Sequence, residues 1–181
     1  MIAEETLVKD LQHPESRSKA FEVLVDLYKQ RLYWHIRRIV LNHEDADDVL
    51  QNTFIKVYKN IEGFKGESKL FSWMYRIATN ESLTLLKTKA RKLDIGNGEL
   101  QDKMIGNLTA DVYFEGDAIQ LKLQKAISSL PEKQKLVFNM KYFDELKYTE
   151  ISEILDKSVG GLKASYHLAV KKIEAYLKEN G

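Results

Sequence analysis

Two segments of the sequence hold side chains that could do chemistry, and the first of them is acidic. It comprises His43, Glu44, Asp45, Ala46, Asp47 and Asp48. A histidine among carboxylates can bind a metal ion or transfer protons, so a metal-dependent hydrolase is one interpretation of this segment. The simpler interpretation is the start of a helix, because the helix dipole favours negative charge in the first turn.

The same residues begin a polar ridge. Asp45, Asp48 and Asn52 recur at steps of three and four, opposite the apolar positions of the helix that follows. Such a ridge suits a basic protein partner. The sequence has no cysteine, no glycine-rich phosphate loop and no nucleophilic triad arrangement. An enzyme is therefore the weaker interpretation, and we expect no catalytic residue, no bound metal and no cofactor.

The second segment, residues 64–76, alternates aromatic rings with cations. Flat rings stack on the bases of single-stranded nucleic acid, at roughly 1–3 kcal/mol per base, while cations neutralise its phosphates. The alternative is that the rings simply pack in a core. Helical spacing places Trp73 and Ile77 on one buried face. Phe64 stands in a glycine-containing loop outside any helical pattern, and we expect Phe64 and Phe71 to be less buried.

The C-terminal residues 148–177 have the pattern of two helices joined by a turn of about three residues. Thr149 and Ser158 are the expected N-caps of these helices. In a helix-turn-helix the second helix enters the major groove, where its early polar side chains face bases and its later lysines meet phosphate. The alternative is a solvated helix whose lysines only keep the chain in solution. The side chains available to DNA are Lys163, Ser165, His167, Lys171 and Lys172.

Helices must position these segments. Apolar residues recur at steps of three and four over most of residues 21–90 and 117–177. With 9 glycines and 2 prolines in 181 residues, the composition also favours helices over a β-sandwich. Residues 92–116 hold glycines and keep no sustained period, which is typical of a linker. We predict an all-α protein of two small helical domains, residues 1–91 and 117–181, joined by a flexible linker of residues 92–116.

Charge is unevenly distributed, although the whole chain has a net charge of only +1. Residues 17–91 carry 14 basic and 9 acidic side chains, and residues 117–181 carry 11 and 9. The linker carries 2 basic and 5 acidic side chains. Two basic domains therefore flank an acidic connector, as expected if both domains meet an anionic partner. No apolar run approaches the ~20 residues of a membrane-spanning helix, and residues 1–16 have no hydrophobic signal core. We expect a soluble, cytoplasmic protein without direct membrane insertion.

Several motifs together resemble the extracytoplasmic function (ECF, or group 4) sigma factors of bacterial RNA polymerase. Residues 44–58, EDADDVLQNTFIKVY, resemble sigma region 2.2. Residues 64–80 resemble regions 2.3 and 2.4, and residues 130–143 with the final helix-turn-helix resemble regions 4.1 and 4.2. The motifs occur in the family's order and cover nearly the whole chain outside the linker, so the set is far more specific than any one motif.

The resemblance implies an initiation subunit that binds core RNA polymerase, melts the minus-10 promoter element with its first domain and recognises the minus-35 element with its second. Contacts to the clamp helices of the largest polymerase subunit would come from Asp45, Asp48, Gln51 and Asn52. Minus-10 contacts, including a pocket for a flipped base, would come from Phe64, Lys65, Ser68, Lys69, Phe71, Arg76 and Asn80. Minus-35 contacts would come from Ser158, Lys163, Ser165, His167, Lys171 and Lys172.

The second helix of the helix-turn-helix departs from the family pattern at three positions. ECF sigma factors often have arginines where this chain has Ser165, Leu168 and Val170. The resemblance also implies an anti-sigma factor as a partner, and an acidic linker that passes through the polymerase toward the RNA exit. The nearest alternative is a helix-turn-helix regulator that binds duplex DNA without the polymerase.

Overall fold

The computed structural model describes residues 3–108, 111 and 116–181 of the chain. Within these residues the secondary structure is entirely helical, which confirms the all-α prediction. The first five α-helices are α1 (Glu4–Gln12), α2 (Arg17–Val40), α3 (His43–Asn60), α4 (Leu70–Leu93) and α5 (Asn97–Leu108). The last four are α6 (Ala118–Ser128), α7 (Glu132–Tyr142), α8 (Tyr148–Leu155) and α9 (Val159–Glu179).

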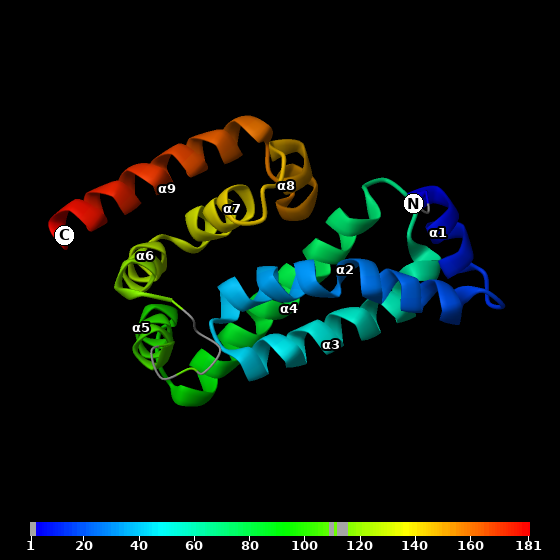
Figure 1. Cartoon of the computed structure of the whole chain (residues 1–181), viewed down its shortest axis with the longest axis horizontal. Coiled ribbons are helices and arrows are strands. Elements are labelled where there is room, and N and C mark those ends of the chain that lie inside the picture. Colours follow the sequence, from blue (N-terminus) through cyan, green and yellow to red (C-terminus); the bar gives the residue numbers. More distant parts are fainter. Residues whose placement is uncertain (1–2, 109–110, 112–115) are drawn as a thin grey trace.

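The body of the first domain consists of α2, α3 and α4, which lie side by side in Figure 1. Each helix turns an apolar stripe inward, as the periodicity predicts. Leu32, Val57 and Met74, one from each helix, are completely buried in this shared core. The polar residues on the opposite faces of these helices remain exposed to solvent. The three-helix core therefore gives a rigid base for the loop between α3 and α4.

The N-terminal helix α1 was not predicted from the sequence. It packs across the end of α2 through Leu7 and Leu11, which are buried. The Arg17 Nε donates to the Leu11 carbonyl oxygen over 2.9 Å and so ties the turn between the two helices. This helix also contacts the loop that carries Phe64.

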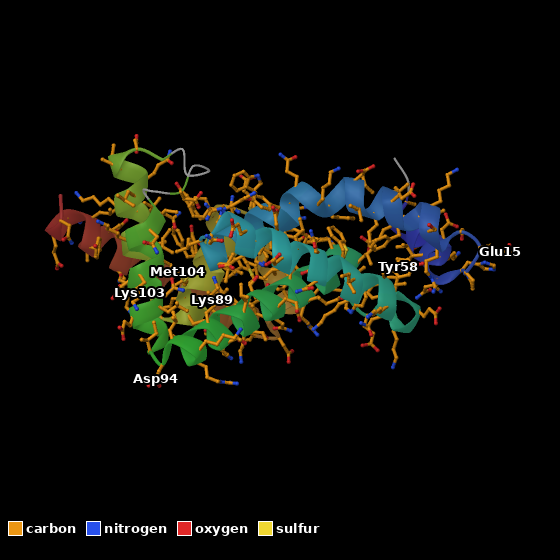
Figure 2. The ribbon with its side chains drawn as sticks, turned by 90° about the horizontal axis from the view of Figure 1, so that it is seen from below. Glu15, Tyr58, Lys89, Asp94, Lys103 and Met104 are labelled. Carbon is orange, nitrogen blue, oxygen red and sulfur yellow. The ribbon has the colours of Figure 1, made fainter. Side chains whose placement is uncertain are left out.

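The segment between the domains, predicted as a flexible linker, contains a helix. The chain turns at Asp94, whose φ of 53° lies in the left-handed region, and continues into α5. Figure 2 shows this turn and the adjacent helix through the labelled Asp94, Lys103 and Met104. Leu100 and Ile105 are buried, but against different parts of the core, which explains the irregular apolar spacing.

The second domain consists of α6 to α9, and its last two helices form the predicted helix-turn-helix. Ser158 caps α9 as expected, since its hydroxyl accepts from the Gly161 N–H at 3.2 Å. The N-cap prediction for α8 is wrong. That position is Lys147, and the Glu150 carboxylate accepts from the Lys147 N–H at 2.8 Å, so Thr149 lies inside the helix.

The two domains pack against each other. Helix α8 lies against α4, and α7 lies against α2. Met140, Ile151 and Leu162 of the second domain belong to the same buried cluster as the core of the first. A smaller cluster around Phe138 and Ile173 holds α6, α7 and α9 together. The chain is therefore in a closed arrangement, in which part of each domain's surface is covered by the other.

Candidate nucleic-acid and polymerase-binding surfaces

The loop between α3 and α4 is held in a fixed shape by the N-terminal helix. A short 3-10 turn (Ile61–Gly63) leads into Phe64, whose backbone is extended. The Gln12 side-chain amide donates to the carbonyl oxygens of Ile61 and Phe64, at 3.1 and 2.8 Å. The Glu4 carboxylate accepts from the Leu70 N–H at 3.0 Å, where α4 begins. Distant side chains thus satisfy backbone groups on both sides of the loop.

The expectation that Phe64 and Phe71 are less buried than Trp73 is wrong. Phe64 is 9% exposed and Phe71 is 8% exposed, whereas Trp73 is only half-buried. The Phe64 ring lies against Trp73 with centroids 5.1 Å apart. Phe71 meets the edge of Tyr75 and carries the Arg31 guanidinium 5.2 Å from its centroid. Phe64 is covered by a contact between the loop and α4, and Phe71 by a contact between α4 and α2, and helical periodicity cannot register contacts between elements.

A cavity of about 450 Å³ opens beside the loop. Its lining from the first domain combines aromatic, cationic and hydroxyl side chains with one carboxylate, namely Gly63, Phe64, Lys65, Glu67, Ser68, Trp73 and Arg76. Four of the predicted minus-10 residues therefore meet at one cavity. Lys69 lines an adjoining hollow together with Lys65 and Ser68. Asn80 is exposed one turn beyond Arg76 on α4, and Phe71 packs in the core instead of lining the cavity.

Two of the cations at this surface have partners in the second domain. The Lys69 ammonium lies 3.1 Å from the Glu150 carboxylate, and the Arg76 guanidinium donates to the Glu153 carbonyl oxygen. Burial acts to raise the pKa of Glu150, but hydrogen bonds from the Lys147 N–H and the Lys69 ammonium outweigh it and hold that pKa below its ordinary value. Without the second domain, Lys69 and Arg76 would lose these partners.

The polar ridge predicted on α3 is only partly exposed. Asp48, Gln51 and Asn52 are all exposed on one side of the helix. Asp45 differs from them, because its carboxylate is paired with the Lys89 ammonium of α4 and joins α3 to α4. We therefore separate Asp45, which stabilises the first domain, from the three exposed side chains that a protein partner can reach.

The acidic segment at the start of α3 behaves as a helix terminus. The Asn42 side chain caps the helix by accepting from the Asp45 N–H at 2.9 Å. His43 contacts the Tyr33 hydroxyl at 2.7 Å through Nδ1 and the Asp47 carboxylate at 3.2 Å through Nε2. In the described residues, no three histidine or acidic side chains are grouped to hold a metal ion. The metal-dependent hydrolase interpretation finds no support in this geometry.

Helix α9 presents most of its predicted DNA-binding side chains to solvent. Lys163, His167, Lys171 and Lys172 are exposed. Ser165 is an exception and a correction, because it is only 8% exposed. It stands on the inward face of α9 with Leu162, Ala169 and Ile173, at the three- and four-residue steps of a buried stripe. The residue at this position therefore packs in the core and does not face a groove.

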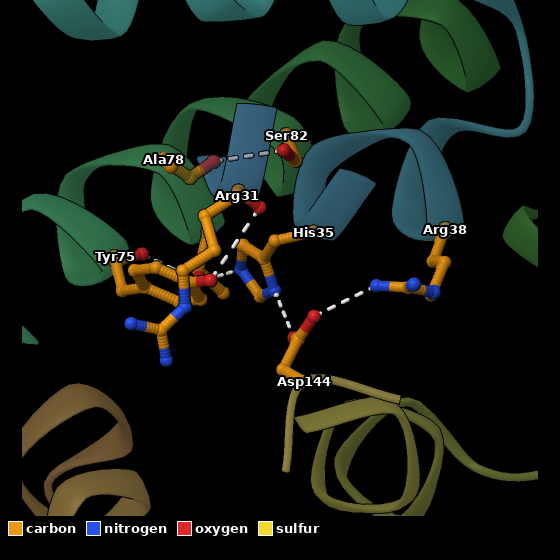
Figure 3. Close-up of polar contacts among 8 residues, drawn as sticks. Arg31, His35, Arg38, Tyr75, Ala78, Ser82 and Asp144 are labelled. Carbon is orange, nitrogen blue, oxygen red and sulfur yellow. Dashed lines mark hydrogen bonds and ion pairs between the residues drawn. The ribbon is translucent and has the colours of Figure 1, made fainter. Parts of the chain in front are cut away.

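Sequence reasoning also missed side chains that lie between the domains. The side chain of Asp144, in the turn after α7, is 4% exposed and contacts His35 and Arg38 of α2 (Figure 3). Glu153 of α8 lines the cavity of the first domain. Nothing in the local sequence distinguishes these two acidic residues from ordinary surface carboxylates, because their partners lie between 77 and 109 residues away along the chain.

Comparisons with known proteins find matches to both domains of the chain. Residues 24–92 match the sigma-70 region 2 family, and residues 120–173 match sigma-70 region 4. The ECF RNA polymerase sigma factor SigW of Bacillus subtilis is 35% identical over 172 residues, covering 88% of this chain and 90% of its own. The ECF RNA polymerase sigma-E factor of Haemophilus influenzae is 31% identical over 181 residues, covering 96% of this chain and 94% of its own.

Two solved structures share the fold. CnrH in complex with the cytosolic domain of CnrY superposes with a TM-score of 0.71 at 19% identity, covering 99% of this chain and 100% of its own. The sigma factor RpoE of Bartonella quintana, in complex with the anti-sigma factor NepR, superposes with a TM-score of 0.67 at 18% identity. The match covers 88% of this chain and 98% of the RpoE chain. No helix in the described residues is long and apolar enough to cross a membrane. The chain belongs to the ECF family of RNA polymerase sigma factors.

Proposed function

We infer that this sigma factor divides promoter initiation among three surfaces of its own chain. The observation that carries this inference is the cavity lined by Phe64, Trp73 and Arg76, because aromatic walls beside a cation suit a base taken out of a DNA duplex. The work is binding and melting of DNA without a catalytic residue. We assign residues 1–91 to polymerase and minus-10 binding, 92–116 to the connector and 117–181 to minus-35 binding.

In the minus-10 element, the chain would capture a base after it leaves the stack. The cavity offers the Trp73 and Phe64 rings as a wall, with the Ser68 hydroxyl and Lys65 ammonium at its edge. Arg76 and Asn80 continue along one face of α4, where they can follow the sugar-phosphate backbone of the melted strand. Binding energy at the cavity would offset the cost of unpairing, which is a few kcal/mol per base.

In the minus-35 element, α9 would enter the major groove. Lys163 and His167 stand on its exposed side near the start of the helix, where base edges are in reach. Lys171 and Lys172 follow one to two turns later and would neutralise phosphates. Ser158 contributes by capping the helix, which fixes the position at which α9 begins.

The exposed ridge of Asp48, Gln51 and Asn52 on α3 would bind core polymerase. Replacing both Gln51→Ala and Asn52→Ala should weaken core binding by about 5- to 10-fold, which corresponds to a joint loss of about 1–1.4 kcal/mol of interface energy. Stability should change little, because neither side chain is buried. Fluorescence-detected titration with core polymerase measures the affinity, and thermal unfolding measures the stability.

The double variant Gln30→Ala and Asn180→Ala is the matched control, since it removes two exposed amides outside the ridge. Equal core affinity of the ridge variant and this control would refute the assignment of α3. In vitro transcription on a genomic template library, with core polymerase present or omitted, tests the function as a whole. Promoter-specific binding that does not need core polymerase would instead support a helix-turn-helix regulator.

The structural neighbours extend the proposal to regulation. CnrH and the Bartonella RpoE were each solved with a partner, the cytosolic domain of CnrY and the anti-sigma factor NepR. We infer that an anti-sigma factor binds this chain as well and that it works in the cytoplasm, where RNA polymerase is found. Co-purification of the chain from its native cell, with and without the inducing stress, tests for such a partner.

A further inference from the structure

We propose that a second cavity, at the junction of α4, α5 and α7, is a binding site for an aliphatic carboxylate, a small molecule with an apolar chain and an anionic head. This junction cavity has a volume of about 500 Å³, within the range of about 300–1,000 Å³ that small-molecule sites occupy. It shares no lining residue with the cavity beside Phe64. The proposal therefore concerns a ligand other than DNA or polymerase.

Three parts of the chain build the walls of the junction cavity. Helix α4 contributes Leu83 and Leu86, and α5 contributes Gly98 and Leu100. Helix α5 contacts both α4 and α6 (Figure 1). The turn between α6 and α7 supplies the third wall through residues 128–132. Because these walls come from distant parts of the sequence, no local pattern predicts the cavity.

The buried part of the lining is mainly aliphatic. Its members are at most 9% exposed, namely Ile39, Leu86, Leu100, Leu130 and Leu136. Among the described residues that line the cavity, none is aromatic. A hydrocarbon chain buried against such side chains gains about 4-fold in affinity for each CH₂ group. The lining therefore fits the apolar part of the ligand.

Polar groups without partners lie in the same lining. The Ser128 hydroxyl, at the end of α6, is buried and has no hydrogen-bond partner among the described residues. Asn139, which is 3% exposed, also lines the cavity. A buried hydroxyl without a partner costs free energy, so a ligand that supplies an acceptor is stabilised at this position. The ligand therefore needs a polar head as well as an apolar chain.

Lys135 determines the charge of that head. Its side chain lines the cavity, and it forms no salt bridge within the described part of the chain. Burial lowers the pKa of Lys135 below its ordinary value of 10.5, and the negative charge of Glu132 opposes this shift without cancelling it. The other charged side chains of the lining, Lys87, Asp102 and Glu132, are exposed to solvent. An anion beside Lys135 would therefore favour the charged ammonium.

The start of α7 adds to the same preference. Its N-cap is Pro131, which has no side-chain group to cap the helix. The first backbone N–H groups of α7 therefore have no partner within the helix, and the positive end of the helix dipole favours an anion. A cation, an unpartnered hydroxyl and a helix start thus border one aliphatic cavity. A carboxylate on a hydrocarbon chain complements all of them.

Titration calorimetry of the full chain with decanoate tests the proposal. Decanol is the probe with the same chain and no charge. The parent should bind one decanoate, and each shortening of the chain by two carbons should weaken binding by about 15-fold. Lys135→Met keeps an apolar stem and should weaken decanoate binding by about 10- to 100-fold, as expected for loss of a charge-assisted hydrogen bond, without a change for decanol. Lys133→Met is the control, because Lys133 is exposed on the same helix and does not line the cavity.

A second pair of variants tests the location of the site independently of charge. A Cβ atom at Gly98 meets no atom within 4 Å, so Gly98→Leu adds a side chain to the wall without a clash. This variant should largely abolish binding of both decanoate and decanol. Gly106→Leu is the control, because Gly106 has the same free space on α5 and lies outside the lining. Thermal unfolding checks that each variant is folded, and decanoate should raise the unfolding temperature of the parent.

The two pairs decide separate parts of the proposal. Equal decanoate affinity of Lys135→Met and Lys133→Met overturns the assignment of an anionic head. Equal affinity of Gly98→Leu and Gly106→Leu overturns the location of the site. Absence of saturable decanoate binding to the parent, or an affinity that does not depend on chain length, overturns the aliphatic carboxylate as the ligand.

Discussion

The two DNA-binding surfaces that we propose are built in opposite ways. The minus-10 surface depends on side chains from α1, the loop, α4 and α8, and its key ring, Phe64, is 9% exposed. The minus-35 surface lies on α9 alone, where Lys163, His167, Lys171 and Lys172 are exposed and Ser158 caps the helix. The first surface is assembled from distant parts of the chain, and the second is encoded locally.

The difference has a functional meaning. A surface that must unpair DNA has to hold its groups in place before the strand arrives, because ordering a loop on binding would weaken capture. A surface that docks a helix in a groove needs only a stable helix with charged side chains. In the closed arrangement, α8 contacts Lys69 and Arg76 beside the first surface, while the lysines of α9 stay exposed.

The largest effect should come from the ring at the cavity. Phe64→Leu keeps an apolar side chain against Trp73 but removes the flat face, which contributes roughly 1–3 kcal/mol to stacking. Melting of a duplex promoter should fall by about 5- to 150-fold, and minus-35 contacts should be unchanged. Permanganate footprinting of unpaired thymines measures the open complex.

A promoter with a pre-opened minus-10 bubble should restore part of this loss, since the duplex no longer has to be unpaired. Ile77→Leu is the control, because it alters a half-buried side chain on the same helix away from the cavity lining. If Phe64→Leu melts duplex promoter as well as the parent, Phe64 is a packing residue and base capture lies elsewhere.

A smaller effect, confined to the other surface, should follow from loss of phosphate contacts on α9. Lys171→Gln with Lys172→Gln should weaken binding to a minus-35 duplex by about 10-fold and reduce the salt dependence by about two counterions. The free chain and the polymerase-bound form should lose affinity equally, because the closed arrangement leaves α9 exposed. Electrophoretic mobility shifts across a salt series measure both quantities.

The control for this surface is Lys122→Gln with Lys125→Gln on α6, which makes the same change in net charge. A loss as large in the control would mean that only the overall charge of the domain matters. A loss seen only in the polymerase-bound form would mean that α9 is covered in the free chain after all.

The locally encoded parts of the molecule could be predicted from the sequence. Helical periodicity predicted α2, α3 and α4 with ends close to the observed ones, and Ser158 marked the start of α9. Exposure of Gln51 and Asn52 also followed from their position opposite an apolar stripe. In each case, residues a few positions apart determine the outcome, because capping and amphipathic spacing are local effects.

The rest depends on contacts between distant residues. Phe64 is buried because Gln12 and Trp73 hold its loop, and Asp144 is buried because His35 lies opposite it in space. The helix α5 was missed because its apolar residues face two different neighbours, which removes a single periodic stripe. Ser165 was misplaced because a small polar residue fits either face of a helix.

The importance of α1 to the minus-10 surface can be tested by removing one side chain. Gln12→Ala deletes the amide that donates to the Ile61 and Phe64 carbonyl oxygens. Loss of these bonds should cost about 1 kcal/mol and reduce promoter melting by about 5-fold, with no change in minus-35 binding. Glu5→Ala, on the same helix but exposed, is the control. Unchanged melting in Gln12→Ala would show that the loop keeps its shape without α1.

The smallest effect concerns pH and the contact between Glu150 and Lys69. The pKa of Glu150 is held below its ordinary value of 4.5 in the closed chain, so its contribution to closure is fully present above pH 4.5 and is lost as pH falls through the lowered pKa. Lys69 is 53% exposed, so the contribution should stay below about 1 kcal/mol. Interdomain distances measured from pH 6 to pH 4 should show the closed fraction of the parent falling toward that of Glu150→Gln. If the gap between the two proteins is the same at both ends of this range, Glu150 does not contribute to closure through its charge.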